Sequence, residues 1–218
     1  MSTPCSQDSR AVPDAAWDTV AAWYDSHHAT FETTTLSLPT PPLLETFRAQ
    51  LPASARVLDA GCGAGRDSRA LVEAGFTVHA LDLSAQMVRA TRDVTDGRVR
   101  PRQMDLRDYA DPAGSWDGIW CLASLLHLPR PQVPAVVAAL ARSLRPGGVL
   151  ALSVKHGAGE ILDSMGRPVT LFMPGEIGAF LTGADTPHLH VEIDTAQAPS
   201  SAGTTRWINA LATRPDRS

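Results

Sequence analysis

The sequence predicts an α/β fold in which a mixed β-sheet is covered by helices on both faces. From Arg56 onward, short apolar segments typical of strands alternate with segments typical of amphipathic helices. This order calls for a mainly parallel sheet with helices on both sides. The last two expected strands, Leu189–Asp194 and Thr205–Ala212, are joined only by Thr195–Thr204. A parallel crossover needs a longer connection, so we expect these two strands to pair as an antiparallel hairpin.

The elements of this part of the chain follow from apolar periodicity and from helix caps. Ser84 is a suitable N-cap for a helix that includes Met87 and Val88, and Pro174 opens another helix. Further helices are expected at Arg66–Ala74, before Gly75, and at Pro131–Leu144. The other strands are expected at Arg56–Ala60, Thr77–Leu81, Val99–Met104, Asp117–Leu122 and Val149–Val154.

The segment before Arg56 lacks the alternation of strands and helices. Residues 1–13 are polar and predict a disordered tail. Asp14–His28 has apolar residues at three- and four-residue steps, which predicts a helix, and Leu43–Gln50 predicts another. Between them, Thr33–Thr35 and Pro39–Pro42 predict turns. We expect residues 14–52 to form an N-terminal helical lid on a single domain formed by residues 53–214.

Composition limits the classes of protein to which the chain can belong. Its 218 residues, 44% of them hydrophobic, suffice for one substantial core. A net charge of −4 without a dense basic patch argues against a nucleic-acid partner. The start has no apolar signal-peptide core, and the longest apolar stretch, Val133–Ala141, is too short to cross a membrane. Cys5, Cys62 and Cys121 match no zinc-site spacing. We expect a cytoplasmic monomer or homodimer without a metal or membrane anchor.

The stretch "VLDAGCGAG", residues 57–65, carries the first functional signal. Its glycines Gly61, Gly63 and Gly65 are spaced one residue more tightly than in the dinucleotide-binding fingerprint. Asp59 precedes them at the end of a strand. A carboxylate there repels a pyrophosphate and attracts a cation. The loop therefore predicts a ligand with a cationic group.

Two more acids follow at the ends of successive strands. Asp82 is placed to accept hydrogen bonds from a ribose diol, and Asp105 to accept one from the exocyclic amine of adenine. A ribose, an amine-bearing base and a cationic group without phosphate together describe S-adenosylmethionine. The structural alternative is that these acids cap the helices that follow or lie in solvated loops.

The sequence resembles the class I S-adenosylmethionine-dependent methyltransferases in "VLDAGCGAG", in Asp82 and in "LRPGGVLALSV". The resemblance implies a Rossmann-like sheet of seven strands with the last strand antiparallel. It also implies that the glycines hold the methionine part of the cofactor. The segments "GCGAGRDS", "LLHL" and "SVKHGAGE" are similar to a small bacterial subgroup related to the tellurite-resistance type. The expected cofactor-binding residues are Tyr24, Asp59, Gly61, Gly63, Gly65, Asp82, Leu83, Met87, Asp105, Leu106, Cys121 and Leu122.

The side chains expected to face the methyl acceptor lie at later strand ends. His127 follows the fourth strand of the sheet, and Lys155, the only lysine, ends the fifth together with His156. These three are the candidate catalytic residues, while Arg167 and Arg206 are candidates for binding a polar or anionic acceptor. For His127 the alternative is that it caps a helix or fills a polar gap, and for Arg167 a solvated surface charge.

We therefore predict an S-adenosylmethionine-dependent methyltransferase that acts on a small molecule by in-line displacement. One alternative is a cofactor-binding sensor or partner subunit without turnover, in which Thr33–Pro42 would plug the acceptor site. A second is a nicotinamide-dependent oxidoreductase. Fold alone does not identify the atom that receives the methyl group.

Overall fold

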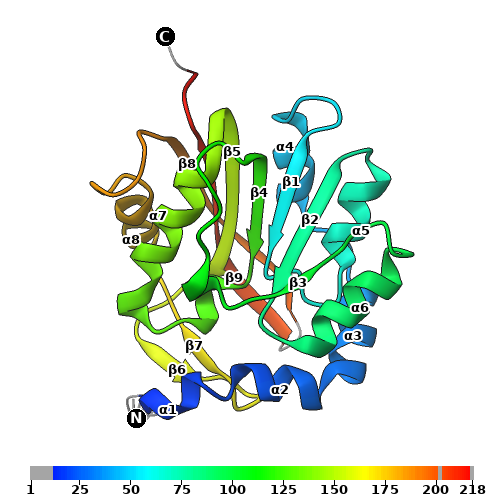
Figure 1. Ribbon diagram of the computed structural model, residues 1–218. Helices are drawn as coiled ribbons and strands as arrows, with labels where there is room; N and C mark the ends of the chain where they lie inside the picture. The colour runs from blue at the N-terminus through cyan, green and yellow to red at the C-terminus, as the bar shows by residue number, and fades with distance from the viewer. Residues whose placement is uncertain (1–11, 201–202, 217–218) are drawn as a thin grey trace.

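A computed structural model describes residues 12–200 and 203–216, so nearly all of the tail predicted for residues 1–13 lies outside the described residues. In the described ranges, the main sheet has seven strands in the order β3-β2-β1-β4-β5-β9-β8 (Figure 1). Strand β9 runs antiparallel to both of its neighbours, and the other pairs are parallel. This confirms the predicted mixed sheet. The strands are β1 (Arg56–Ala60), β2 (Thr77–Asp82), β3 (Arg102–Gln103), β4 (Trp116–Leu122), β5 (Leu144–Lys155), β8 (His190–Ser200) and β9 (Gly203–Thr213).

The central strands are buried on both faces, and successive side chains enter two different cores. In β1, Val57 packs with α4 (Pro42–Ala49) and α5 (Arg66–Glu73), whereas Leu58 packs with α7 (Val133–Ser143) and α8 (Pro174–Leu181). Each side chain in a strand points away from the face used by its neighbour. Helices therefore cover both faces, as predicted, and α6 (Ala85–Val94) packs beside α5.

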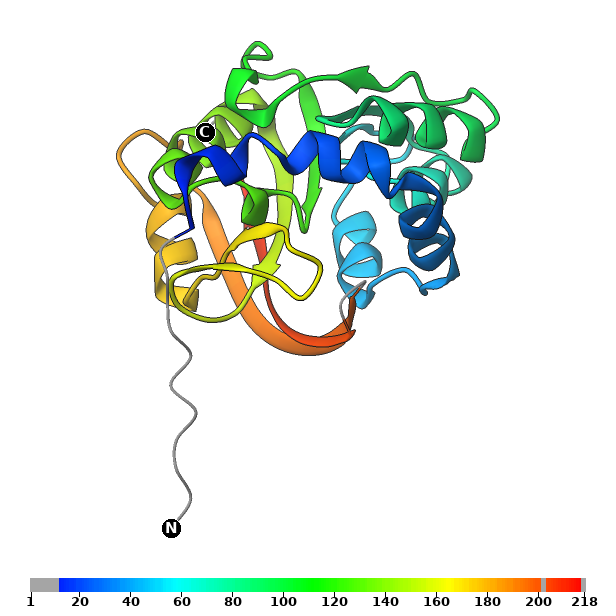
Figure 2. The same ribbon diagram turned by 90° about the horizontal axis from the view of Figure 1, so that it is seen from below.

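The N-terminal helices differ from the prediction. Instead of one helix over Asp14–His28 there are α1 (Asp14–Trp17) and α2 (Val20–Ser26), followed by α3 (His28–Ser37). The Thr19 hydroxyl donates to the Ala16 carbonyl at the break, a local bond that competes with the helix. The segment Thr33–Thr35, predicted as a turn, is helical, and the Thr33 hydroxyl donates a hydrogen bond to the Ala29 carbonyl. Figure 2 shows α1 and α2 lying across one edge of the sheet.

Three other segments also differ from the expected strands. The strand predicted at Val99–Met104 shortens to β3, where Pro101 has no N–H to donate to a neighbour. After β5, an unpredicted small hairpin is formed by β6 (Glu160–Leu162) and β7 (Pro168–Thr170). The last hairpin is longer than predicted, because β8 and β9 stay paired as far as Ser200 and Gly203. Within residues 12–200 and 203–216, no helix is both long and apolar enough to cross a membrane.

Substitution of Gly65 tests how closely α5 packs against α6. Its φ is +85°, and a Cβ there would lie 2.6 Å from Val94 Cγ1 and 2.8 Å from Thr91 Cα. Gly75 has a similar φ of +90° but has nothing within 4 Å of that position. We expect Gly65→Ala to lower the free energy of unfolding by about 3 kcal/mol, because strain and overlap add. Gly75→Ala should cost only about 1 kcal/mol, from strain alone. Equal losses in chemical denaturation would contradict the overlap.

Candidate functional site

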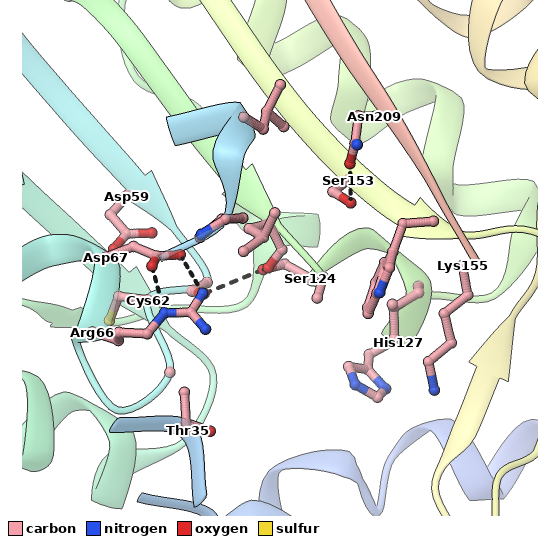
Figure 3. Close-up of a pocket in the computed structure, with 18 of the residues that line it drawn as sticks. Thr35, Asp59, Cys62, Arg66, Asp67, Ser124, His127, Ser153, Lys155 and Asn209 are labelled. Atoms are coloured by element: carbon pink, nitrogen blue, oxygen red, sulfur yellow. Dashed lines mark hydrogen bonds and ion pairs between the residues drawn. The ribbon is translucent and has the colours of Figure 1, made fainter. Parts of the chain in front are cut away.

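A cavity of about 680 Å³ lies where the carboxyl ends of the parallel strands meet (Figure 3). Such an edge is the usual ligand site of open α/β sheets. Residues from β1, β2, β4 and β5 line the cavity, and those from α2 and α3 include Tyr24, Phe31 and Thr35. The β8–β9 hairpin adds a wall that includes Trp207 and Asn209. The cavity is therefore enclosed by the sheet edge, the N-terminal helices and the last hairpin.

Most of the predicted site residues meet at this cavity, but four lie outside its described lining. Cys121 is fully buried in the core on the α7 side of the sheet, and Arg206 is exposed. His156 is half-buried and forms an isolated bridge to Phe172. Gly65 instead permits the close contact between α5 and α6. The predicted residues that line the cavity are Tyr24, Asp59, Gly61, Gly63, Asp82, Leu83, Met87, Asp105, Leu106, Leu122, His127, Lys155 and Arg167.

Strand alternation explains three of these four exceptions. Leu122, Lys155 and Trp207 line the cavity, so the strand neighbours Cys121 and Arg206 point to the opposite face. His156 follows Lys155 directly and is displaced from the cavity in the same way. Both members of the pairs Cys121–Leu122 and Lys155–His156 were expected at the cavity, but only Leu122 and Lys155 line it.

The glycine loop is held by backbone hydrogen bonds and by contact with Ser124. The N–H groups of Gly61 and Cys62 donate to the Leu81 carbonyl, at 2.8 and 3.0 Å. A Cβ at Gly61, whose φ is +90°, would lie 2.0 Å from Ser124 Oγ. The loop thus needs glycine at this position.

Asp59 is a buried carboxyl group beside this loop. Its side chain is 2% exposed and accepts a hydrogen bond of 2.6 Å from Ser68 Oγ. Burial, and next the charge of Asp67, raises the pKa of Asp59 to about 8. Asp67 itself accepts bonds from Arg66, at 2.7 and 3.0 Å, and from the Trp120 indole. The Arg66 charge is therefore directed to Asp67, and Asp59 lines the cavity without a cation of its own.

Asp82 and Asp105 both line the cavity, but their environments differ. Asp82 accepts the N–H groups of Gly63 and Ser84, each at 2.9 Å, while burial raises its pKa to about 6. Asp105 caps a short 3-10 helix, Leu106–Asp108, and its carboxylate accepts three bonds from Arg107. The capping alternative is what the structure shows for Asp105, whereas Asp82 braces the glycine loop at the cavity.

Tyr24, His127 and Arg167 form one hydrogen-bonded network at the other end of the cavity. Nδ1 of His127 lies 3.0 Å from the Pro168 carbonyl oxygen, which can only accept, so Nδ1 carries the proton. Nε2 must then accept from the Tyr24 hydroxyl, at 2.9 Å. Arg167 donates to the oxygen of Tyr24, also at 2.9 Å. The basic nitrogen of His127 is thus occupied by Tyr24 in this conformation.

Asp25 is a site-forming residue that sequence reasoning missed. Its carboxylate accepts a hydrogen bond of 2.5 Å from Ser84 Oγ and one of 3.1 Å from the Gln86 N–H, at the start of α6. The preceding residue, Tyr24, contacts His127 and Arg167 on the opposite side of the cavity. Helix α2 therefore spans both halves of the site. An acid next to the predicted lid aromatic was the one available signal.

Lys155 lies on the same side of the cavity as His127, and Figure 3 shows both side chains directed into it. Lys155 is 9% exposed, and its Nζ lies 3.9 Å from the Asp163 carboxylate. That carboxylate already accepts bonds of 2.7 and 3.0 Å from Arg167. Burial lowers the pKa of Lys155, although the charge of Asp163 opposes this effect. The ammonium group is thus buried beside the cavity with only a long contact to a shared carboxylate.

Comparison with known proteins identifies part of the chain. Residues 57–148 match the family described as "Methyltransferase domain". The ubiquinone biosynthesis O-methyltransferase of Xanthomonas axonopodis pv. citri is 41% identical over 118 residues, which cover 52% of this chain and 48% of the relative. The chain therefore spans about half the length of the relatives of this kind that it matches.

Solved structures extend the similarity to nearly the whole fold. A Burkholderia thailandensis 1,6-didemethyltoxoflavin-N1-methyltransferase, bound to 1,6-didemethyltoxoflavin and S-adenosylhomocysteine, is 24% identical. It has a TM-score of 0.69 over 93% of this chain and 88% of its own. The cyclase SpnF has the same TM-score, at 16% identity, over 95% of this chain and 100% of its own. These structures confirm the Rossmann-like fold, and the cyclase illustrates that the fold alone does not determine the reaction.

We expect His127 to remain neutral far below the pH at which a histidine side chain usually becomes protonated. Burial and the Arg167 charge lower its pKa from 6.5 to about 3. The unfolded chain takes up this proton near pH 6.5, so the free energy of unfolding should fall as the pH falls from there towards 3. Nitrogen NMR of the imidazole should report the Nδ1–H tautomer across this window. Protonation of the folded protein near pH 6.5, or an Nε2–H tautomer, would contradict the network.

Proposed function

We propose that this chain is an S-adenosylmethionine-dependent methyltransferase that transfers a methyl group to a small molecule. The observation that carries the proposal is one cavity with two chemically different halves. The first half has a glycine loop and the acids Asp59 and Asp82, within the segment that matches the methyltransferase-domain family. The second half has Lys155, Trp207 and Asn209. A cofactor and an acceptor therefore fit side by side.

The residues of the first half suit a cationic cofactor. Asp59 and Asp82 supply acidic groups there, whereas the guanidinium of Arg66 is already paired with Asp67. A phosphate would meet these acids without a free cation to balance it. The ligand-bound relatives, such as the Burkholderia methyltransferase with S-adenosylhomocysteine, support the same cofactor class. We assign the methionine part to the loop at Gly61 and Gly63.

The bound cofactor supplies a methyl group already activated by a sulfonium, so the protein has to align, enclose and desolvate the reactants. Asp82 is placed to hold the ribose, and Leu83, Met87 and Leu106 to surround the adenine. Tyr24 and Phe31 cover the cavity from the lid. His127 stays neutral and hydrogen-bonded, which gives it a positioning role on Tyr24 in this conformation.

The non-catalytic alternative predicted a plugged acceptor site. Thr35 and Leu38–Pro42 do line the cavity, yet about 680 Å³ remains, which is within the usual range for small-ligand sites. This favours an enzyme. The relative in Xanthomonas is by name an O-methyltransferase, which supports oxygen as the acceptor atom.

Several finer assignments belong to this proposal. The relation to tellurite-resistance-type methyltransferases rests on "GCGAGRDS", "LLHL" and "SVKHGAGE". Residues 14–52 would act as a lid on residues 53–214. The cytoplasm as location, and a monomer or homodimer as the active form, are also proposed.

Cofactor binding should release a proton from Asp59. With a pKa of about 8, Asp59 is mostly protonated at pH 7 in the free protein, and a bound cation favours its anion. Calorimetry with S-adenosylmethionine at pH 7, in two buffers of different ionisation enthalpy, should show close to one more proton released by the wild type than by Asp59→Asn. Release should vanish at higher pH, where Asp59 is already ionised.

Asp82→Ala provides the complementary test, because it removes the proposed ribose acceptor while Asp59 stays in place, and it should weaken binding. We expect a loss of about tenfold or more, the size of one or two hydrogen bonds to a charged group. If the wild type binds no S-adenosylmethionine at high protein concentration, the proposed function is wrong. If it binds with equal proton release in both the wild type and Asp59→Asn, only the role of Asp59 is wrong.

A further inference from the structure

Three neighbouring strands form the wall of the cavity opposite the cofactor half. Lys155 of β5 pairs with Trp207 of β9, and Ser153 pairs with Asn209. Asn209 pairs in turn with Asp194 of β8. Side chains of directly paired residues point to the same face, and all five line the cavity. This wall, which we call the acceptor wall, was predicted only at Lys155.

The buried charge on the acceptor wall is positive. Lys155 is nearly buried, whereas Asp194 and Glu192 are exposed on the edge strand β8, where water and salt screen them. The nearest carboxylate to Lys155 is Asp163, at 3.9 Å, and Arg167 holds that group more closely. An ammonium in this position is only partly compensated, so a bound anion would stabilise it.

The rest of the wall offers a flat apolar surface and a directed donor. Trp207 is half-buried and lines the cavity beside Lys155. Its ring suits stacking with a planar ligand. Ser153 Oγ donates to Asn209 Oδ1 at 2.9 Å, which orients the amide of Asn209. The amide NH₂ then serves as a donor on the wall, suited to a carbonyl or ring heteroatom.

We propose that the methyl acceptor is a planar conjugated molecule bound as its oxygen anion, a phenolate or enolate, with the anion on Lys155 and the ring on Trp207. This inference rests on the proposed methyl transfer and names the class of acceptor. It also explains why no free base is needed: Nε2 of His127 already accepts from Tyr24.

The step balances without a proton transfer. A lone pair of the acceptor oxygen forms the new C–O bond, and the bond from the methyl carbon to sulfur breaks with its electron pair remaining on sulfur. The negative oxygen and the positive sulfur both become neutral. The product therefore loses its ion pair with Lys155, which favours its release.

Matched probes test the class of acceptor. We would measure binding of 4-nitrophenol and 7-hydroxycoumarin, both ionised at about pH 8.5, against their methyl ethers, 4-nitroanisole and 7-methoxycoumarin, in the presence of S-adenosylhomocysteine. Each anion should bind about tenfold to a hundredfold more tightly than its ether, the range for a hydrogen bond to a charged group. Equal binding of anions and ethers, or no binding of either anion, would overturn the proposal.

Variants of the acceptor wall test which residue causes the preference for the anion over its methyl ether. Lys155→Met should abolish the preference for the anion, and Lys155→Arg should retain most of it. Arg206→Met is the matched control, because it removes a positive charge next to Trp207 that is exposed and outside the cavity lining. Trp207→Leu should weaken binding of both the anion and its methyl ether in each pair of probes. A preference that survives in Lys155→Met, or is lost in Arg206→Met, would contradict the assignment.

The single lysine of the chain permits a test on the wild type alone. Incorporation of ε-¹³C-lysine gives one NMR signal, whose titration reports the pKa of Lys155. Bound phenolate should raise this pKa, and the methyl ether should not. No shift with phenolate would overturn the ion pair even if Lys155→Met fails to fold. Binding of S-adenosylhomocysteine by the wild type separates this outcome from a failure of the proposed function.

Discussion

The site depends on the alternation of side chains along strands that are buried on both faces. In β1, Leu58 and Ala60 fill one core while Val57 fills the other, and Asp59 lies at the cavity in the same strand. In β1 and β5, the side chains at the cavity, Asp59, Ser153 and Lys155, are flanked by neighbours that fill a core. The same rule selects Leu122 over Cys121. The chemistry of the cavity is thus determined by the register that gives the sheet its two cores.

Helix α2 is held by two adjacent residues that point to different halves of the site. Asp25 bonds to the start of α6, beside the cofactor half, while Tyr24 bonds to His127 and Arg167 on the acceptor half. Trp23 adds a bond from its indole to the Met165 carbonyl, which attaches α2 to the loop between β6 and β7. Because both attachments lie on one short helix, movement of α2 would disturb both halves together. Binding in one half should therefore alter the other.

The sequence predicted what local patterns encode. The strand at Arg56–Ala60, the N-cap at Ser84 and the acids lining the cofactor half all follow from short-range signals, and the structure contains each of them. Long-range contacts were beyond reach: Asp25 meets Ser84 across 59 positions, and Ser153 meets Asn209 across 56. The acceptor wall needed the register of β5 with β9, which an apolar pattern does not specify. Trp207 was visible in the sequence, but its neighbour Arg206 had the more obvious charge.

Asp59 illustrates how burial alters the meaning of a sequence signal. As a charged carboxylate at a strand end, it predicted attraction for a cation. In the folded chain, burial and Asp67 raise its pKa to about 8, so the free protein holds it largely neutral near pH 7. A neutral carboxyl group avoids the cost of a buried, unpaired charge before the ligand arrives. A bound cation then favours loss of the Asp59 proton, and part of the binding free energy is used to ionise this carboxyl group. Binding of a cation beside Asp59 is therefore coupled to release of a proton. In the acceptor half, by contrast, Lys155 is already charged before an anion binds.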